Sequence, residues 1–283
     1  MGKIILETKE LTFAYPDGTK ALQGVSVQIK AGKTTAILGN NGAGKSTLFL
    51  NLKGMLKPHG GEIFFQGEPV AYQKGEAKAL WRAVGLVFQD PDNQLFSASV
   101  FQDVSFGPMN LNLSQDEVKN RVEDALQRTG ISHLRNKPTH SLSYGQKKRV
   151  ALAGVLAMEP KLLILDEPTA GLDPAGIEEI MGLIQEMQQK SGISVMISTH
   201  DIDLVPLYCD EVYVLNQGRI ALSGPPREVF TQGQVLQELH LRLPWIAQLM
   251  EVLSKEDQFH FDAPGVTVSQ ARETINRWRA ENK

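Results

Sequence analysis

One short stretch, residues 39–46, constrains this chain more than any other. It reads Gly-Asn-Asn-Gly-Ala-Gly-Lys-Ser and fits the phosphate-loop pattern G-x-x-x-x-G-K-[ST] at every fixed position. The preceding run, 34–38, is β-prone, and we expect a helix over 46–52. A strand, a glycine-rich turn and a helix in this order predict a loop that holds phosphates on its amide N–H groups and on the helix N-terminus. A glycine-rich turn that binds nothing is the alternative, and the flanking strand and helix count against it.

The residue types of this loop suit a triphosphate with its metal. Gly39, Gly42 and Gly44 allow close approach of the backbone and the positive φ angles that such a loop requires. Lys45 brings a positive charge to the β- and γ-phosphate oxygens, and Ser46 offers a hydroxyl to Mg²⁺.

Composition narrows the class of protein. The chain has 283 residues, a net charge of −3 and ordinary apolar and charged fractions, so we expect one large soluble domain or one domain with an appendage. The slightly acidic balance argues against nucleic acid as the main partner. The single Cys209 excludes an intrachain disulfide and a cysteine-based zinc site. Without a secretory signal or an apolar run of about 20 residues, we expect a cytoplasmic protein whose membrane role comes through a partner.

Polar residues follow three buried-type strands that we expect over 84–88, 162–165 and 193–198. Gln89 follows the first strand, Asp166 and Glu167 the second, and His200 the third. Alternation of such strands with helices predicts an α/β core with parallel crossovers, in which these residues meet at one edge of the sheet. After a phosphate loop, a carboxylate such as Asp166 holds Mg²⁺ and Glu167 can orient water. Gln89 could reach the metal or the water, or it could be a solvated loop residue, and its position alone leaves the two readings even.

The remaining segments are assigned from periodicity and turn signals. Residues 4–8, 11–15 and 24–29 are predicted as antiparallel strands, and 212–215 and 219–222 as a hairpin. Tyr15, where a strand meets a turn, could stack on an adenine ring or be an ordinary strand aromatic.

Helices are predicted over most of 97–158. Residues 114–117 form a capping box. Ser143 caps a helix from about 147 to 158, and its free amides make a second anion site. Asp173 caps another helix, which starts at Pro174.

Residues 231–283 suggest amphipathic helices with a break at 261–265. We interpret them as a small appendage to a domain of residues 1–230. A helix pair that packs on the core and a dimer contact are equally favoured readings of it.

Together these motifs resemble the nucleotide-binding subunit of ATP-binding cassette (ABC) transporters. The resemblance covers about residues 4–230 and rests on six elements in order: Tyr15, the phosphate loop, Gln89, Leu142–Gln146, Asp166-Glu167 and His200. Residues 87–96 are similar to the ATPases of energy-coupling-factor importers, and residues 106–109, 146–151 and 203–208 resemble the cobalt-import ATPases, CbiO. The family's signature is usually Leu-Ser-Gly-Gly-Gln, and here Tyr144 replaces the first Gly. The implied fold is an α/β P-loop NTPase with a mixed core sheet, an N-terminal antiparallel β subdomain, an inserted helical subdomain (about 97–158) and a C-terminal helical extension.

The resemblance also implies roles for individual residues. Tyr15 would stack on adenine, and His200 would contact the γ-phosphate. Glu167, His200, Gln89 and Lys45 are the implied catalytic residues, while Ser46, Gln89 and Asp166 are the implied Mg²⁺ ligands. The implied contacts to ATP are Tyr15, Gly39, Asn40, Asn41, Gly42, Ala43, Gly44, Lys45, Ser46 and Thr47 from this chain and, at the site of a facing subunit, Ser143, Gly145 and Gln146.

The implied partners are a second copy of the chain or a sister ATPase, a CbiQ-like integral membrane coupling subunit and a CbiM-like substrate-binding membrane subunit, with no nucleic acid. The chain would then be peripheral, on the cytoplasmic face of the cell membrane. The apolar residues Val100, Phe101, Val104 and Phe106 are expected to receive a helix of the coupling subunit. Cobalt, as opposed to another micronutrient, is implied by resemblance alone. The alternatives are a soluble ABC-type ATPase acting on nucleic acid or ribosomes and, ranked last, a small-molecule kinase.

Overall fold

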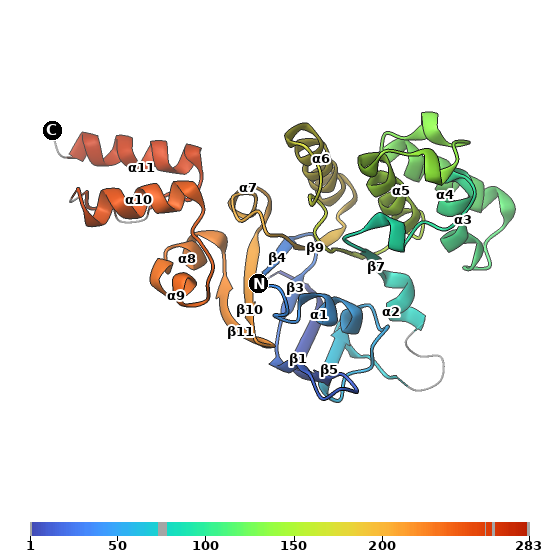
Figure 1. The fold of residues 1–283 in the computed structure, drawn as a ribbon, viewed down its shortest axis with the longest axis horizontal. Helices are drawn as coiled ribbons and strands as arrows, with labels where there is room; N and C mark the ends of the chain where they lie inside the picture. Colours follow the sequence, from blue (N-terminus) through green and yellow to red (C-terminus); the bar gives the residue numbers. More distant parts are fainter. Residues whose placement is uncertain (1, 73–77, 258, 262–263, 282–283) are drawn as a thin grey trace.

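The computed structural model describes residues 2–72, 78–257, 259–261 and 264–281. Its centre is a mixed sheet, with an antiparallel sheet beside it, a group of helices at one side and a helical extension at the other (Figure 1). The α/β fold with a mixed core sheet and an antiparallel β subdomain, which we expected from the sequence, is therefore confirmed. Among the described residues, no helix is both long and apolar enough to cross a membrane.

The mixed sheet carries the elements that matter for the site. Its strand order is β11-β10-β4-β9-β8-β7, and every neighbouring pair is parallel except β10 with β11. The four parallel strands β4, β7, β8 and β9 are buried throughout, as their nearly continuous apolar sequences require. The strands are β4 Thr34–Leu38, β7 Val84–Val87, β8 Leu162–Leu165, β9 Ser194–Ser198, β10 Glu211–Asn216 and β11 Arg219–Gly224.

The antiparallel sheet has the order β2-β1-β5-β6, with β3 also pairing with β1. Its strands are β1 Ile4–Ala14, β2 Lys20–Val25, β3 Gln28–Lys30, β5 Gly60–Phe65 and β6 Glu68–Pro69. The two strands predicted over 4–8 and 11–15 are thus one strand, and the strand predicted over 24–29 is split between β2 and β3. A contact between the two segments accounts for both differences. Glu10 has φ +49° inside β1, and its N–H donates to Ser26 Oγ at 3.0 Å, in the gap between β2 and β3.

Helices α3, α4 and α5 pack on one another over residues 97–158 (Figure 1). They span Val100–Met109, Gln115–Arg128 and Tyr144–Leu156. The capping box predicted at 114–117 is only half formed, because Ser114 caps Glu117 N–H while the Glu117 carboxylate accepts from Arg121 instead. The complete box lies at Ser143 and Gln146, which is why α5 begins at Tyr144 and not near residue 147.

The apolar surface expected on α3 is partly wrong. Val100 and Val104 are 0% exposed and belong to the hydrophobic core, because their spacing of four puts both on the inner face of the helix. Phe106 is 52% exposed and packs edge-to-face on Phe96 with ring centroids 4.7 Å apart. Phe96 and Phe106 therefore form the exposed aromatic surface beside α3.

The other helices follow the remaining strands. Helix α1 leaves the phosphate loop, α2 precedes β7, and α6 lies between β8 and β9 with Asp173 as its N-cap and Pro174 as its first residue, as predicted. Their bounds are α1 Lys45–Leu52, α2 Lys78–Ala83, α6 Pro174–Ser191 and α7 Val205–Tyr208.

Helix α8 Pro226–Phe230 follows β11, and the C-terminal extension over residues 231–283 contains α9 Gly233–Glu238, α10 Trp245–Lys255 and α11 Val268–Glu281. Helices α10 and α11 lie side by side, away from the mixed sheet (Figure 1). Of the break predicted at 261–265, residues 262–263 lie outside the described residues. Asn40 and Asp203 of the core make polar contacts with the extension. Asn40 Nδ2 donates to Leu239 O at 2.9 Å, and Asp203 accepts from Trp245 N–H at 2.7 Å and pairs with Arg242.

Candidate active site

The phosphate loop joins β4 to α1 and admits only glycine at its tightest points. Gly44, just before α1, has φ +108°, and a Cβ there would lie 2.5 Å from Ala21 O. A Cβ on Gly39 would lie 2.2 Å from Leu215 O. The loop is thus pressed against the neighbouring strands β2 and β10.

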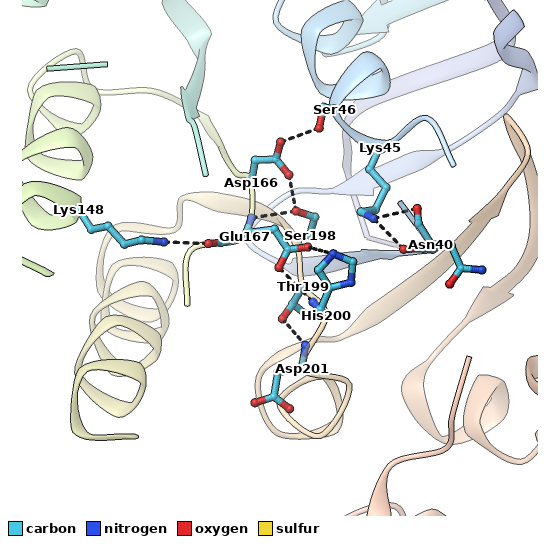
Figure 2. A network of polar contacts seen from close by, with 11 residues as sticks. Asn40, Lys45, Ser46, Lys148, Asp166, Glu167, Ser198, Thr199, His200 and Asp201 are labelled. Carbon is cyan, nitrogen blue, oxygen red and sulfur yellow. Dashed lines mark hydrogen bonds and ion pairs between the residues drawn. The ribbon is translucent and has the colours of Figure 1, made fainter. Parts of the chain in front are cut away.

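Lys45 is folded back into this loop. Its Nζ donates to Gly39 O at 2.7 Å and to Asn40 O at 3.2 Å (Figure 2). Burial lowers the pKa of Lys45, and Glu167 and Asp166 partly oppose that shift. An ammonium has three N–H donors, so one remains for a ligand oxygen.

The carboxyl ends of β8 and β9 meet the loop through hydroxyl groups. Ser46 Oγ donates to Asp166 Oδ2 at 2.8 Å, and Ser198 Oγ donates to Asp166 Oδ1 at 2.6 Å. The same Ser198 oxygen accepts from Glu167 N–H at 2.9 Å, so one hydroxyl aligns both acidic residues (Figure 2). Ser198 is not among the residues predicted from the sequence. The available signal is a serine at the last position of a buried strand, two residues before His200.

Glu167 is 5% exposed and lies beside His200. Its Oε2 accepts from His200 N–H at 3.1 Å. Its Oε1 lies 3.3 Å from His200 Nε2 and, within the described chain, accepts no hydrogen bond. Burial raises the pKa of Glu167, while His200 and Lys45 hold it down. A buried carboxylate oxygen without a donor is a suitable acceptor for a water or substrate proton.

These side chains share one cavity of about 280 Å³. Tyr15 is part of its wall, with Oη 3.0 Å from Thr47 Oγ1, and exposed Gln89 is another part. Thr19, Lys20 and Ala21 also line it, although they were not predicted. The predicted site residues that line this cavity are Tyr15, Asn40, Asn41, Gly42, Ala43, Gly44, Lys45, Ser46, Thr47, Gln89, Asp166, Glu167 and His200.

Ser143, Gly145 and Gln146 do not line this cavity. They line a separate hollow of about 540 Å³, together with residues 171–173 and 175–176. Tyr144, the departure from the usual signature, is the first residue of α5 and is not among the described residues with positive φ, so this position does not require glycine.

The residues present fit a magnesium-bound triphosphate. The glycine-rich loop, the Lys45 ammonium and the N-terminus of α1 suit the phosphates. Ser46, Asp166 and Gln89 supply hydroxyl, carboxylate and amide oxygens, the hard donors that Mg²⁺ prefers. In the described part of the chain, no group of three or more His, Cys, Asp or Glu side chains is placed to hold a metal ion.

Comparison with known proteins gives one consistent result. The ABC transporter family model matches residues 22–170. The energy-coupling factor transporter ATP-binding protein EcfA2 of Clostridium perfringens is 58% identical over 99% of this chain and 98% of its own length. EcfA of Methanocaldococcus jannaschii is 48% identical over 98% and 99%, respectively.

Solved structures agree with these relatives. The structure of cbiO1 from Clostridium perfringens, described as part of the ABC transporter complex cbiONQ, is 59% identical with a TM-score of 0.76, covering 88% of this chain and 99% of that one. The ATP-binding cassette MJ0796, described as dimeric in a post-hydrolysis state with ADP and Pi, is 27% identical with a TM-score of 0.71, covering 79% and 99%.

Proposed function

Since the chain belongs to the ABC transporter family, whose cassettes bind and hydrolyse ATP, we propose that it is the ATP-hydrolysing subunit of an energy-coupling-factor importer. The observation that carries the proposal is the single cavity into which the phosphate loop, Asp166, Glu167 and His200 all converge. Relatives named as energy-coupling-factor ATPases match almost the whole chain, which supports the importer class over other ABC proteins.

We infer the following division of labour among the residues. The loop amides and Lys45 hold the β- and γ-phosphates, and Tyr15 stacks on the adenine at the cavity wall. Ser46, Asp166 and Gln89 would hold Mg²⁺, and a bound Mg²⁺ would neutralise charge that develops on the phosphates. Glu167 Oε1 accepts a proton from the attacking water, and His200 contacts the γ-phosphate from the adjacent loop.

The separate hollow at Ser143, Gly145 and Gln146 supports a site shared between two chains. The N-terminus of α5 opens there with a complete capping box, so its amides are ordered and suited to an anion. We propose that a second copy presents this face to the γ-phosphate. Each chain carries both halves, so a homodimer would have two complete sites.

Replacing Glu167 with Gln tests the hydrolytic role. The amide keeps the shape of the side chain but cannot take up the proton, so we expect turnover to fall by at least about 100-fold while ATP still binds. With Mg-ATP, the variant should sediment as a dimer. Glu186→Gln, an exposed glutamate paired with Lys190, is the matched control and should hydrolyse ATP at the wild-type rate. Retained turnover in Glu167→Gln contradicts the assigned role, and a monomer under all nucleotide conditions contradicts the shared site.

We also propose that a membrane-embedded coupling subunit docks beside α3. A cavity of about 190 Å³ there is lined by Trp81, Phe96 and Phe106, and these exposed aromatics are suited to an inserted apolar side chain. We expect Phe106→Glu to abolish transport and leave the ATPase rate of the isolated chain unchanged. Met109→Glu is the control, because Met109 lies at the end of the same helix, is 66% exposed and is not among the residues that line this cavity. Normal transport by Phe106→Glu would contradict docking at this cavity.

We also propose a cargo for the importer and a role for the C-terminal extension. The likeness to cbiO1 supports a transition metal, with cobalt first. Uptake of labelled Co²⁺ by cells expressing the complex tests it, and competition by a vitamin but not by Ni²⁺ would contradict it. The exposed side chains Trp245, Leu249 and Val252 recur on one side of α10 and support a dimer contact for residues 231–283. We also propose a position at the cytoplasmic face of the membrane, beside the coupling subunit.

A further inference from the structure

A buried lysine on α5 has no role in the division of labour above. Lys148 is 5% exposed, and its Nζ donates to Glu167 O at 2.9 Å and to Pro168 O at 3.0 Å (Figure 2). It is not part of any ion pair among the described residues. A buried ammonium is costly, so a lysine whose partners are two backbone carbonyls calls for an explanation.

The backbone that Lys148 holds is strained. Glu167 has φ +50°, a conformation that residues with a Cβ rarely adopt, and Pro168 after it further restricts its backbone. Such a conformation persists only where its surroundings fix it. Ser198 Oγ accepts from the N–H of Glu167, and His200 N–H donates to the Glu167 carboxylate. The backbone carbonyl of Glu167 accepts from Ala170 N–H and from Lys148.

We propose that Lys148 is a positioning residue for Glu167: its ammonium fixes the two carbonyls and so keeps the Glu167 carboxylate aimed into the cavity. This inference rests on the proposed role of Glu167. Lys148 lies two residues after Gln146, so the helix that presents one half-site is bonded directly to the acidic residue of the other half-site in the same chain.

The charged groups that face Lys148 are Glu167 at the end of β8 and Asp90 after β7, and the ring of Tyr144 on its own helix lies with its centroid 5.4 Å from Nζ. Burial lowers the pKa of Lys148 to about 8, and both carboxylates oppose this shift. The neutral amine keeps two N–H donors but loses the charge that strengthens both hydrogen bonds. Above pH 8 the hold on Glu167 should therefore weaken.

The test compares Lys148→Met and Lys148→Arg with Lys190→Met, an exposed lysine paired only within its own helix. We expect Lys148→Met to lower kcat at least about tenfold, since small misplacements of a reacting group cost that much. KM for ATP and the binding of a non-hydrolysable ATP analogue should stay within about twofold of wild type. Lys148→Arg, which keeps a charge, should recover part of the rate, and Lys190→Met should match wild type.

The pH profile separates positioning from a merely structural role. Wild-type kcat should fall as pH rises through about 8, and this limb should be absent in Lys148→Met and shifted to higher pH in Lys148→Arg. The pH dependence of wild-type kcat can be measured even if a variant does not fold. Wild-type kcat constant from pH 7 to 9.5, or a Lys148→Met enzyme with wild-type kcat, overturns the inference. If Glu167→Gln itself retains turnover, the proposed function of Glu167 fails instead.

Discussion

Ser198→Ala removes the hydroxyl that joins the two acidic residues of the site. The hydroxyl is fully buried, donates to Asp166 and accepts from Glu167 N–H. Alanine differs by this one oxygen, so the change leaves the packing of β9 intact and removes two polar contacts.

Both losses lower the free energy of unfolding. A hydrogen bond to a charged group contributes about 1.5–3 kcal/mol, and a buried N–H left without an acceptor costs about 1–3 kcal/mol. Asp166 keeps its hydrogen bond from Ser46, which limits the first loss. We therefore expect unfolding free energy to fall by about 3 kcal/mol, or a decrease in Tm on the order of 6–10 °C for a chain of this size. If Asp166 is a Mg²⁺ ligand, loss of its orienting partner should raise the half-saturating Mg²⁺ concentration for ATP hydrolysis about 10- to 100-fold.

The assay measures the ATPase rate against free Mg²⁺ at saturating ATP, beside urea denaturation of the same preparations. Ser194→Ala is the matched control, because Ser194 is an equally buried serine on the same strand whose Oγ accepts from Gly32 N–H at 3.0 Å, away from the cavity. It should lose about 1 kcal/mol of stability and keep the wild-type Mg²⁺ dependence. The reasoning is refuted if Ser198→Ala keeps that dependence too, or if both variants change it equally.

Three further changes test other parts of the chain. Gly44→Ala puts a methyl 2.5 Å from Ala21 O at φ +108°, so we expect calorimetry to detect no ATP binding; wild-type affinity would contradict the proposed loop geometry. Lys53 has its pKa lowered to about 8 by burial, so from pH 8 to about 10.5 the unfolded chain binds the extra proton and stability rises with pH. Relative to Lys53→Met, wild type should gain up to about 3 kcal/mol across that window in urea titrations, and parallel pH curves would exclude it. Ser143→Ala removes the cap of α5 and should cost about 1 kcal/mol in the nucleotide-free chain, measured by urea denaturation.

The sequence predicts the centre of this fold well because local rules and tertiary structure agree there. The strand at 34–38, the phosphate loop and the strand before Asp166 are found where they were expected, since buried parallel strands leave a nearly continuous apolar run in the sequence. The Asp173-Pro174 helix start is likewise a local signal.

Long-range pairing explains most of what could not be predicted. Whether Val100 and Val104 face the core or the solvent depends on α5, which begins more than thirty residues later. The single strand β1 depends on Ser26 satisfying Glu10. Lys148 gives no sign of burial in its sequence, because Lys-Lys-Arg favours a solvated helix face; only the fold brings it under Glu167.

The contacts of Asn40 and Asp203 connect the C-terminal helices directly to the phosphate loop and to the segment that follows His200. Asn40 belongs to the phosphate loop and grips the backbone at Leu239, while Asp203 follows the His200 loop and grips Arg242 and the start of α10. We therefore expect a displacement of either loop to act on the extension through these hydrogen bonds. A shortened chain ending near residue 230 would lose both connections. We therefore expect its ATP turnover to differ from that of the full chain, even though every motif residue is still present.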